Sequence, residues 1–336
     1  MSMSIAEIVA RQRQYFETGA TRGADFRLQA LERLYQALKR EEPLIMEALK
    51  QDLNKAPMET YMCETGLVLE EIRFHKRHLR RWMKKRTVPT PLAQFHAKSF
   101  VSPEPYGVTL IMSPWNYPVQ LCLSPLVGAI SGGNCAVVKP SAYAPATSAA
   151  LAKILGETFP PEYIAVVEGG REQNSALLEE KFDYIFFTGS VAVGKVVMEA
   201  AAKHLTPVTL ELGGKSPVIV DETADVKLAA RRIAFGKVLN AGQTCVEPDY
   251  LFLHEQVKEP FVAAFREALA EFFPKGDYRN MPTIISEKHY RRVKGLLEGE
   301  KILLGGGTDD ARRFVEPTLL DNVSPESPIM QEEIFG

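Results

Sequence analysis

Residues 185–194 read IFFTGSVAVG, an apolar run that passes through glycine and serine into a helical pattern. A strand that leads through a short turn into a helix is the unit from which parallel sheets are built. The first turn of such a helix has backbone N–H groups without helical partners, and its dipole favours an anion, so the turn suits a pyrophosphate. Gly189 and Gly194 do not have the spacing of the G-x-G-x-x-G motif, and a strand–turn–helix capped by Ser190 explains the pattern equally well.

Strands and helices alternate on either side of this unit. Short apolar runs predict strands at Val108–Met112, Ala136–Lys139, Ile164–Glu168 and Asp183–Thr188, and helices at Ala146–Phe159 and Ser190–His204. This alternation predicts an α/β fold, a parallel Rossmann-like sheet with flanking helices, followed by a second α/β domain. Residues 4–85 have helical spacing, and the prolines within 87–91 should end the last of these helices.

Length and composition indicate a globular enzyme of two domains. The 336 residues are 46% apolar and 24% charged, with a formal net charge of −2. That charge gives no overall field to attract nucleic acid or an acidic membrane. The basic run Lys76–Arg86 could be a nucleic-acid patch, but a solvated helix face fits the overall charge better. We therefore expect no nucleic-acid partner.

The cysteines and the N-terminal residues bear on compartment. Cys63, Cys122, Cys135 and Cys245 have neither paired nor metal-ligand spacing, which fits a reducing cytosol and predicts no metal site. Residues 1–14 carry no apolar signal core, and no apolar run is long enough to span a bilayer. The sequence thus predicts a cytoplasmic protein with no membrane segment in this stretch.

Two further stretches contain a nucleophile and a candidate base. Residues 240–246 read NAGQTCV, and residues 210–217 read LELGGKSP, with Glu211 lying 34 positions before Cys245. A thiol and a carboxyl group on separate loops are a usual arrangement for covalent catalysis. Cys245 could instead be a buried structural thiol, and Glu211 could be a strand-end partner in an ion pair. The apolar neighbours of Glu211 favour a partly desolvated acid with a raised pKa.

Two polar side chains follow predicted strands. Lys139 ends its strand, where ligands bind in parallel sheets, and its ammonium could reach a ribose or a phosphate. Asn116 lies in a loop fixed by Pro114 and Pro118, and its amide could stabilise an oxyanion. A surface lysine and an asparagine that caps its own turn are the alternatives.

Several separated motifs resemble the aldehyde dehydrogenase superfamily, most closely its class 3 branch, which acts on aromatic and fatty aldehydes. They are WNYP at 115–118, EAAAKHLTPVTLE at 199–211, GQTCV at 242–246, PDY at 248–250 and QEEIFG at 331–336. The resemblance covers essentially the whole chain. It implies N-terminal helices at 1–86, an oligomerisation arm at 87–105, a dinucleotide-binding domain at 106–210, a partial catalytic domain at 211–336, and a homodimer.

The resemblance also implies roles for individual residues. Cys245 is the nucleophile, Asn116 and the Cys245 N–H hold the oxyanion, and Glu211 activates the water that releases the acid. The implied reaction is NAD(P)-dependent oxidation of an aldehyde through a cysteine thiohemiacetal and thioester. The implied cofactor contacts are Trp115, Lys139, Ser141, Gly189, Ser190, Gly194, Leu212, Glu333 and Phe335.

Two departures from the family pattern carry expectations. The chain ends at Gly336, where members of the family continue, so we expect uncovered strand edges and apolar surface in the second domain and a longer biological chain. Ala142 stands where many members have a glutamate that restricts the adenosine ribose, which predicts use of NADP as well as NAD. Glu168 is an acid that could fill the same role.

Other functions remain open at this stage. A cysteine esterase or thioesterase would use the same thiol without a cofactor, but it would normally pair the thiol with a histidine, and no histidine lies in a recognisable motif. A CoA-acylating dehydrogenase would release the thioester to CoA, which a water-activating Glu211 argues against. A truncated chain could bind a dinucleotide without turnover.

Overall fold

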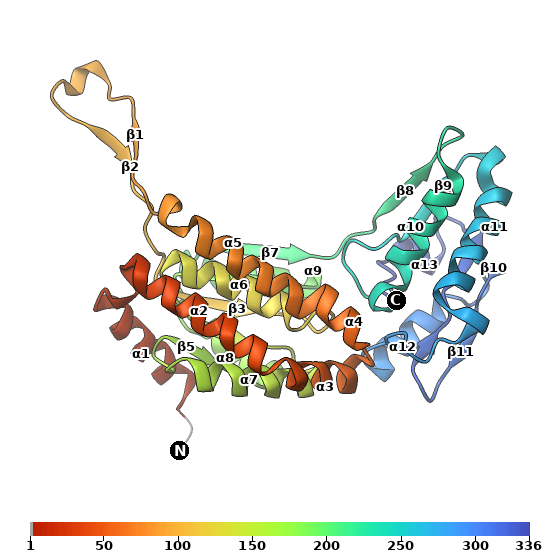
Figure 1. Cartoon of the computed structure of the whole chain (residues 1–336), viewed down its shortest axis with the longest axis horizontal. Coiled ribbons are helices and arrows are strands. Elements are labelled where there is room, and N and C mark those ends of the chain that lie inside the picture. The colour runs from red at the N-terminus through yellow and green to blue at the C-terminus, as the bar shows by residue number, and fades with distance from the viewer. Residues whose placement is uncertain (1–2) are drawn as a thin grey trace. The chain divides into compact units, whose positions relative to one another are not determined.

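The computed structural model describes residues 3–336, which form two compact units (Figure 1). Unit 1 contains the residues up to Ile45 together with Tyr61–Glu211, and unit 2 contains Met46–Thr60 and Leu212–Gly336. Residues 46–60 thus differ from the expectation that all of 1–86 packs on the cofactor domain. The reason lies in hydrogen bonds within unit 2, where Thr283 N–H donates to Leu53 O over 2.8 Å and the Asn54 side-chain Nδ2 donates to Met281 O over 2.8 Å.

Unit 1 is built on a five-stranded sheet with the strand order β5-β4-β3-β6-β7. Its strands are β3 (Val108–Met112), β4 (Cys135–Lys139), β5 (Ile164–Val166), β6 (Tyr184–Gly189) and β7 (Val208–Leu212). β3 is parallel to β4 and to β6, and β4 is parallel to β5. Every residue of β3 and β4 is buried, as expected for a parallel sheet covered on both faces. The predicted fold class is confirmed.

Helices cover this sheet. Those that alternate with the strands are α6 (Gln120–Gly132), α7 (Pro145–Thr158), α8 (Arg171–Glu179) and α9 (Val191–Ala202). Those before the sheet are α1 (Ile5–Glu17), α2 (Ala24–Arg40), α3 (Glu42–Leu53), α4 (Pro57–Thr60) and α5 (Gly66–Trp82), with a π-helical turn at Tyr61–Thr65. α2 and α5 pack on α6, which contacts β3 and β4 (Figure 1). The apolar stripe of α2, which includes Leu31 and Leu34, is therefore fully buried.

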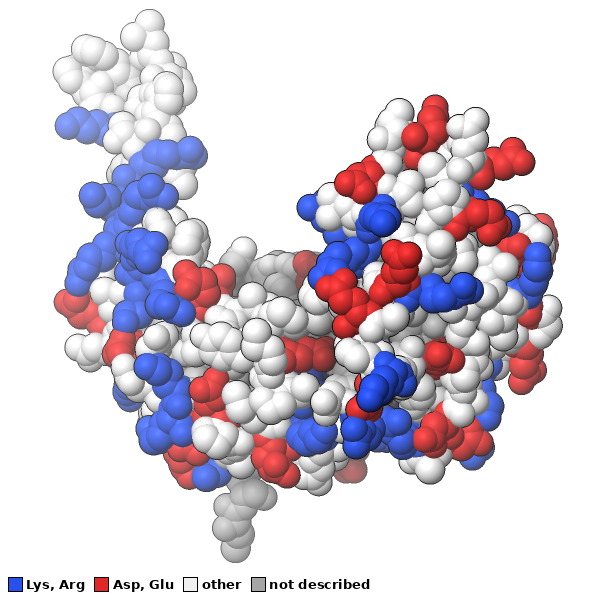
Figure 2. Space-filling view, turned by 45° about the vertical axis from the view of Figure 1, so that its right-hand side comes forward, with Lys and Arg blue, Asp and Glu red and all other residues white. Residues whose placement is uncertain are grey.

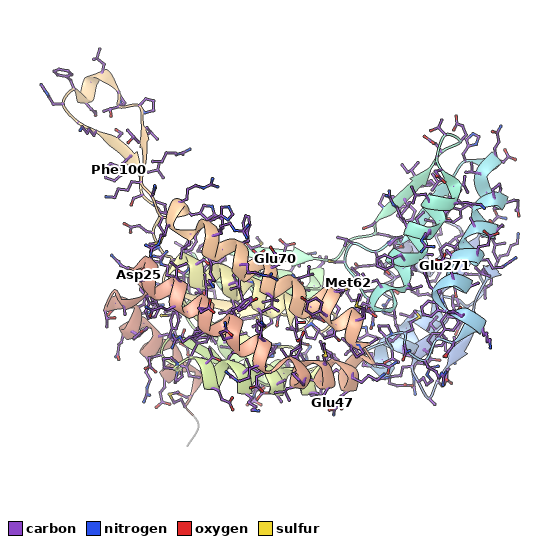
Figure 3. All side chains as sticks on the ribbon, viewed as in Figure 1. Asp25, Glu47, Met62, Glu70, Phe100 and Glu271 are labelled. Atoms are coloured by element: carbon purple, nitrogen blue, oxygen red, sulfur yellow. The ribbon has the colours of Figure 1, made fainter. Side chains whose placement is uncertain are left out.

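A β-hairpin projects from unit 1 (Figure 1). Its strands β1 (Arg86–Val88) and β2 (Ser99–Val101) are antiparallel and too short to bury a face. Leu92 is 87% exposed and Phe95 is 74% exposed, and Phe100, labelled at the base of the hairpin in Figure 3, is 52% exposed. Figure 2 shows lysine and arginine side chains gathered at the base of the hairpin, where the basic run ends.

Unit 2 is a smaller α/β body. Its strands are β8 (Pro217–Val220), β9 (Tyr250–Leu253), β10 (Lys301–Leu304), β11 (Thr308–Asp309), β12 (Phe314–Val315) and β13 (Leu319–Asp321), and its helices are α10 (Val226–Val238), α11 (Glu255–Phe272), α12 (Glu287–Gly295) and α13 (Pro328–Gln331). β8 and β9 are parallel, whereas β10 pairs with β13 and β11 with β12 in antiparallel fashion. Phe261 and Phe265 of α11 fill the core against Ala230 and Ala234 of α10.

From residue 3 to residue 336, no helix combines the length and the apolar character needed to cross a bilayer.

The start of β3 gives a test of the fold. Gly107 has φ +139°, and a Cβ there would lie 2.2 Å from Asp183 Oδ2, which accepts the Val108 N–H over 2.8 Å. We expect Gly107→Ala to lower the stability of unit 1 by about 2–3 kcal/mol, because it combines backbone strain with a clash against that carboxylate. The matched control is Gly156→Ala in α7, where a Cβ meets nothing within 4 Å, so its helix should gain up to about 1 kcal/mol. Thermal unfolding of both variants measures the difference, and equal melting temperatures would contradict the interpretation.

Candidate active site

The carboxyl ends of the unit 1 strands place several predicted residues along one edge of the sheet. β3 leads into the loop of Trp115 and Asn116, β4 ends at Lys139, and β6 ends at Gly189. The chain winds from β3 through β4 to β5 and then returns to the other side of β3 as β6. Ligands of doubly wound sheets bind outside the carboxyl ends of the strands at such a reversal.

A buried carboxylate holds the loop of Asn116. Glu64 is fully buried, and its Oε2 accepts the N–H groups of Val119 and Gln120 over 3.0 and 2.9 Å, at the start of α6. A negative charge at a helix N-terminus is favourable, because it meets unsatisfied N–H groups and the positive end of the dipole. At the other end of the loop Ser113 N–H donates to Lys139 O over 3.1 Å, and Asn116 itself is buried.

Lys139 is buried at the end of β4. Its Nζ donates to Pro140 O over 2.5 Å, and burial lowers the pKa of its ammonium group. Glu168, which follows β5, counteracts that shift through its charge and accepts a hydrogen bond from Ser148 Oγ over 3.1 Å. Ser141 is half-buried, and Ala142 beside it is exposed. An acid therefore does lie near Lys139, although Ala142 carries none.

The turn from β6 into α9 has the features of an anion site. Ser190 caps α9, since its Oγ accepts the Val193 N–H over 3.4 Å. A Cβ at Gly189 would lie 2.6 Å from Phe187 Cζ, so this turn requires glycine. Gly194 is buried in the first turns of α9, and within residues 3–336 the buried Thr188 Oγ1 has no hydrogen-bond partner. Free N–H groups and an unsatisfied hydroxyl at a helix N-terminus fit a phosphate.

Glu211 departs from its expectation. It is the fourth residue of β7, and its side chain is exposed, whereas Leu210 and Leu212 are half-buried. Side chains alternate between the two faces of a strand, so the apolar neighbours point away from the carboxyl group and do not desolvate it. The prediction of a partly desolvated acid is therefore wrong for this structure.

In unit 2, Cys245 lies at the tip of a tight turn. Glu247 N–H donates to Thr244 O over 3.1 Å and closes the turn, and Val246 beside the thiol is 77% exposed. Three consecutive residues before the turn have positive φ: Asn240 at 51°, Ala241 at 53° and Gly242 at 73°. Left-handed backbone at residues other than glycine costs energy and persists only where its surroundings enforce it.

Gln243 fixes the first stem of this turn. Its side chain is fully buried; Nε2 donates to Asn240 O over 2.9 Å and to Thr283 O over 3.1 Å, and Oε1 accepts the Ile285 N–H over 2.9 Å. Glu59 Oε1 accepts the Asn240 N–H over 2.7 Å at the start of the left-handed run. The sequence motif contained Gln243, but nothing local indicated its anchoring role.

Exposure distinguishes Cys245 from the other thiols. Cys63, Cys122 and Cys135 are buried, and Cys245 is not. Burial raises the pKa of Cys122 and of Cys135 to about 12, which keeps both protonated and unreactive. The reading of Cys245 as a buried structural thiol does not fit its place at the turn.

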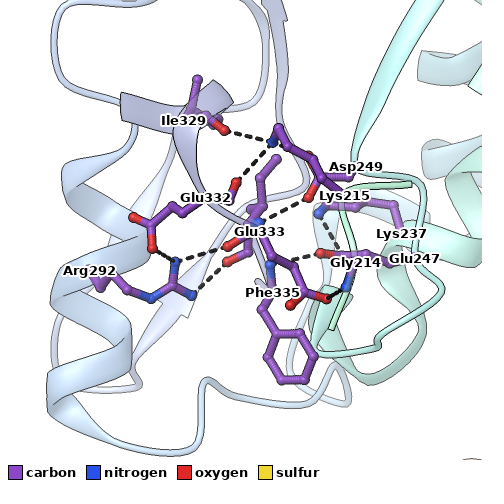
Figure 4. Close-up of polar contacts among 11 residues, drawn as sticks. Gly214, Lys215, Lys237, Glu247, Asp249, Arg292, Ile329, Glu332, Glu333 and Phe335 are labelled. Carbon is purple, nitrogen blue, oxygen red and sulfur yellow. Dashed lines mark hydrogen bonds and ion pairs between the residues drawn. The ribbon is translucent and has the colours of Figure 1, made fainter. Parts of the chain in front are cut away.

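The second stem of the turn meets the Glu332–Phe335 segment (Figure 4). Glu247 is 3% exposed; Phe335 N–H donates to its Oε1 over 2.8 Å, and Lys237 Nζ lies 2.8 Å from its Oε2. Burial raises the pKa of Glu247 to about 7, the Lys237 ammonium opposes that shift, and the Asp249 charge adds to it.

Asp249 contacts the same segment in a similar way. Its Oδ2 accepts the Ile334 N–H over 3.0 Å, and Lys215 Nζ lies 2.5 Å from its Oδ1 (Figure 4). These contacts join residues 85 and 88 positions apart in the chain, so no short-range signal could have identified Glu247 or Asp249.

Glu333 sits against the double glycine. Gly214 N–H donates to Glu333 Oε1 over 3.3 Å, and a Cβ at Gly213 would lie 2.0 Å from Glu333 Oε2, so a larger residue there would displace the Glu333 carboxylate. Burial raises the pKa of Glu333, and the Gly214 N–H opposes the shift. Arg292 Nη2 donates to Ile334 O over 2.6 Å and holds the segment from α12. Within unit 2, Glu333 therefore contacts the double glycine, and Phe335 contacts Glu247, which follows Cys245 by two residues.

Across the described chain, no three or more His, Cys, Asp or Glu side chains lie close enough together to hold a metal ion.

Comparison with known proteins identifies the family. Residues 2–336 match the sequence profile described as the aldehyde dehydrogenase family. The chain is 47% identical over 329 residues to the 4,4'-diaponeurosporen-aldehyde dehydrogenase of Staphylococcus aureus, covering 96% of this chain and 71% of that protein. It is 45% identical to aldehyde dehydrogenase family 3 member B1 of Bos taurus, covering 98% and 71%.

Solved structures agree. The substrate-bound state of Staphylococcus aureus AldH superposes with a TM-score of 0.97 at 45% identity, over 100% of this chain and 74% of that one. A Mycobacterium tuberculosis aldehyde dehydrogenase complexed with NAD+ superposes with a TM-score of 0.87 at 30% identity, over 98% and 71%. The chain therefore belongs to the aldehyde dehydrogenase family, close to its class 3 members, and its activity is the NAD(P)-dependent oxidation of an aldehyde.

Proposed function

We propose that Cys245 is the nucleophile of this oxidation and that Asn116 and Glu211 complete the catalytic set. The observation that carries the proposal is the turn of Cys245, which presents on two anchored stems the one cysteine that is not buried among residues 3–336. An anchored nucleophile loses little freedom on attack, which is how position contributes to rate. Small-residue neighbours leave the carbonyl carbon of an aldehyde room to approach.

The division of chemistry follows from the side chains. The Cys245 thiolate adds to the aldehyde carbon and forms a thiohemiacetal, whose oxyanion takes hydrogen bonds from the Asn116 amide and the Cys245 N–H. Loss of hydride leaves a thioester on Cys245. Glu211, exposed on β7, accepts a proton from the water that hydrolyses the thioester and releases the carboxylic acid.

The residues fit a nicotinamide dinucleotide. When bound, the cofactor supplies the oxidant by accepting the hydride. On the unit 1 side, Ser190 and the N-terminus of α9 suit the pyrophosphate, with Gly189 and Gly194 allowing close approach, and Lys139 and Ser141 suit the adenosine ribose. Trp115, Leu212, Glu333 and Phe335 are proposed to enclose the nicotinamide half.

The substrate class is proposed to be apolar. The named relatives include an enzyme for a diaponeurosporen aldehyde and a family 3 member, which supports an aromatic or a medium- to long-chain aliphatic aldehyde. A cytoplasmic location is part of the same proposal.

Variants of Cys245 and Glu211 test the catalytic roles. Cys245→Ala should abolish reduction of the cofactor but keep dinucleotide affinity within about twofold, because the thiol is not a cofactor contact. Glu211→Gln should give a burst of reduced cofactor and then stall as the acyl-enzyme accumulates. Stopped-flow absorbance with benzaldehyde and hexanal, together with intact mass, measures both outcomes. Cys63→Ala is the matched control and should retain turnover; substantial turnover in Cys245→Ala would refute the covalent route.

Cofactor choice is a second proposal, that the enzyme uses NADP as well as NAD. A carboxylate beside the adenosine ribose repels a 2′-phosphate, and solvent screening leaves about 1–3 kcal/mol of that repulsion, or one to two decades of selectivity. Ala142 lacks the charge, whereas Glu168 lies close enough to influence Lys139.

The ratio of kcat/KM for the two cofactors should therefore move in opposite directions in two variants. Ala142→Glu should favour NAD by about tenfold or more, and Glu168→Gln should favour NADP. A parent enzyme that prefers NAD by more than about a thousandfold would contradict dual use. If only Glu168→Gln changes the ratio, Glu168 is the acid that governs cofactor choice.

The hairpin is proposed to mediate homodimerisation. Its apolar side chains, including Leu92 and Phe95, have no cover within the described chain, and exposed apolar clusters mark association surfaces. Leu92→Asp and Phe95→Asp should each shift the sedimentation coefficient toward that of a monomer. Leu205→Asp, which changes a side chain that is 91% exposed outside the hairpin, is the matched control. Unchanged sedimentation of the hairpin variants would show that the association surface lies elsewhere.

A further inference from the structure

We propose that Glu247 is a positioning residue that couples the turn of the nucleophile to the segment carrying Glu333 and Phe335, so that its ionisation sets cofactor affinity. The inference rests on the proposed function, because Cys245 and Glu333 act together only there. Neither the sequence motifs nor the comparisons assign a role to this carboxylate. Four contacts, all within unit 2, carry the argument.

Glu247 takes part in the turn through its backbone. Its N–H closes the turn on Thr244 O over 3.1 Å, so the position of its peptide fixes the tip that bears Cys245. The first stem is held independently by Gln243, whose amide makes three buried hydrogen bonds. The second stem has Glu247 as its buried side chain, followed by Asp249. A change at Glu247 therefore moves one stem while Gln243 holds the other.

The Glu247 carboxylate reaches two other elements. Its Oε1 accepts the Phe335 N–H over 2.8 Å, and its Oε2 lies 2.8 Å from Lys237 Nζ at the end of α10 (Figure 4). Phe335 has φ +50°, an unfavourable conformation that needs an outside partner to hold it. Glu333 lies two residues before Phe335 and contacts Gly214, so the Phe335 contact also fixes the position of the Glu333 carboxylate.

The charged groups around Glu247 determine the pH range in which its carboxylate binds Lys237 and Phe335. Among the described residues, Lys237 on α10 is the one cation paired with Glu247. Asp249 on the same stem repels it, and Lys215 is paired with Asp249. Arg292 on α12 points to the carbonyl groups of Glu333 and Ile334, and the Cys245 thiol is two residues away.

These surroundings give Glu247 a raised pKa of about 7, with burial as the main cause. Above that pH the carboxylate is ionised and binds Lys237 and Phe335 together. Below it, a proton on Oε2 removes the ion pair with Lys237, and Oε1, now part of a neutral carboxyl group, accepts the Phe335 N–H more weakly. The coupling between the turn of Cys245 and the segment of Glu333 and Phe335 should therefore be strong above about pH 7 and should weaken as the pH falls.

Cofactor binding measured without aldehyde tests the coupling. We would titrate NADH fluorescence between about pH 6 and pH 8.5 in the Cys245→Ala background, which removes the titrating thiol. The dissociation constant should rise about tenfold as the pH falls through about 7, the worth of one hydrogen bond to a charged group. Glu247→Gln should show the weak, low-pH affinity at every pH, and Lys237→Met should move the midpoint upward because it removes the opposing cation.

The thiol gives a second readout that does not depend on the cofactor. In the Cys245 parent, iodoacetamide reports this turn, because the other three cysteines are buried. Glu247→Gln should change the alkylation rate at pH 8 by about threefold or more. Asp321→Asn is the matched control, since it breaks ion pairs of Lys258 and Lys301 in the same unit without contacting the turn, and it should leave both readouts unchanged.

The outcomes separate the two proposals. The coupling is wrong if NADH binding to Glu247→Gln has the same midpoint pH as the parent, or if Lys237→Met leaves that midpoint unchanged. If Glu247→Gln does not fold, Lys237→Met alone decides. If the parent binds NADH with no pH dependence near 7 but Cys245→Ala abolishes turnover, the proposed function stands and only the coupling fails. If no dinucleotide binds at all, the proposed function itself is wrong.

Discussion

The loops that carry the proposed catalytic residues depend on carboxylates that accept backbone N–H groups. Loops leave N–H groups outside helices and strands, and a buried N–H without an acceptor is costly. Glu64 accepts two of them at the start of α6, Glu59 accepts the Asn240 N–H, and Glu333 accepts the Gly214 N–H. Hydrogen bonds to an ionised acceptor are about twice as strong as neutral ones, so each of these contacts can hold a loop that secondary structure cannot reach.

The same kind of contact explains why the fold tolerates strained backbone near the proposed nucleophile, Cys245. Asn240, Ala241 and Gly242 are all left-handed, and two of the three have a Cβ. Glu59 fixes the first of them, and the buried amide of Gln243 fixes the residue that follows. The left-handed run reverses the chain direction between α10 and the turn, which lets Cys245 project while both stems remain buried. Strain of this kind is stored where position matters for chemistry.

The sequence predicts the scaffold better than it predicts these contacts. Apolar runs and glycine–serine turns are local signals, so β3 was predicted with its observed bounds and β6 within one residue at each end. Motif resemblance singled out Cys245, Asn116 and Glu333, which lie in loops of the structure. The partners of those loops lie far away in the chain: Glu64 lies 55 residues before Val119, and Glu59 lies 181 residues before Asn240. Neither spacing has a period or a motif that sequence patterns could reveal.

Glu211 shows a second limit of prediction from sequence. The neighbours of Glu211 are apolar, and their number suggested that its carboxyl group is desolvated. A strand, however, sends alternate side chains to opposite faces. The apolar content of the flanking residues is therefore the wrong measure of the burial of one residue. The exposed Glu211 and the buried Glu247 are therefore suited to different tasks. An exposed carboxylate can exchange protons with water, whereas a buried one responds to pH by changing its contacts. Of the two acids, the one that the motifs did not mark has the environment of a pH-sensitive structural contact.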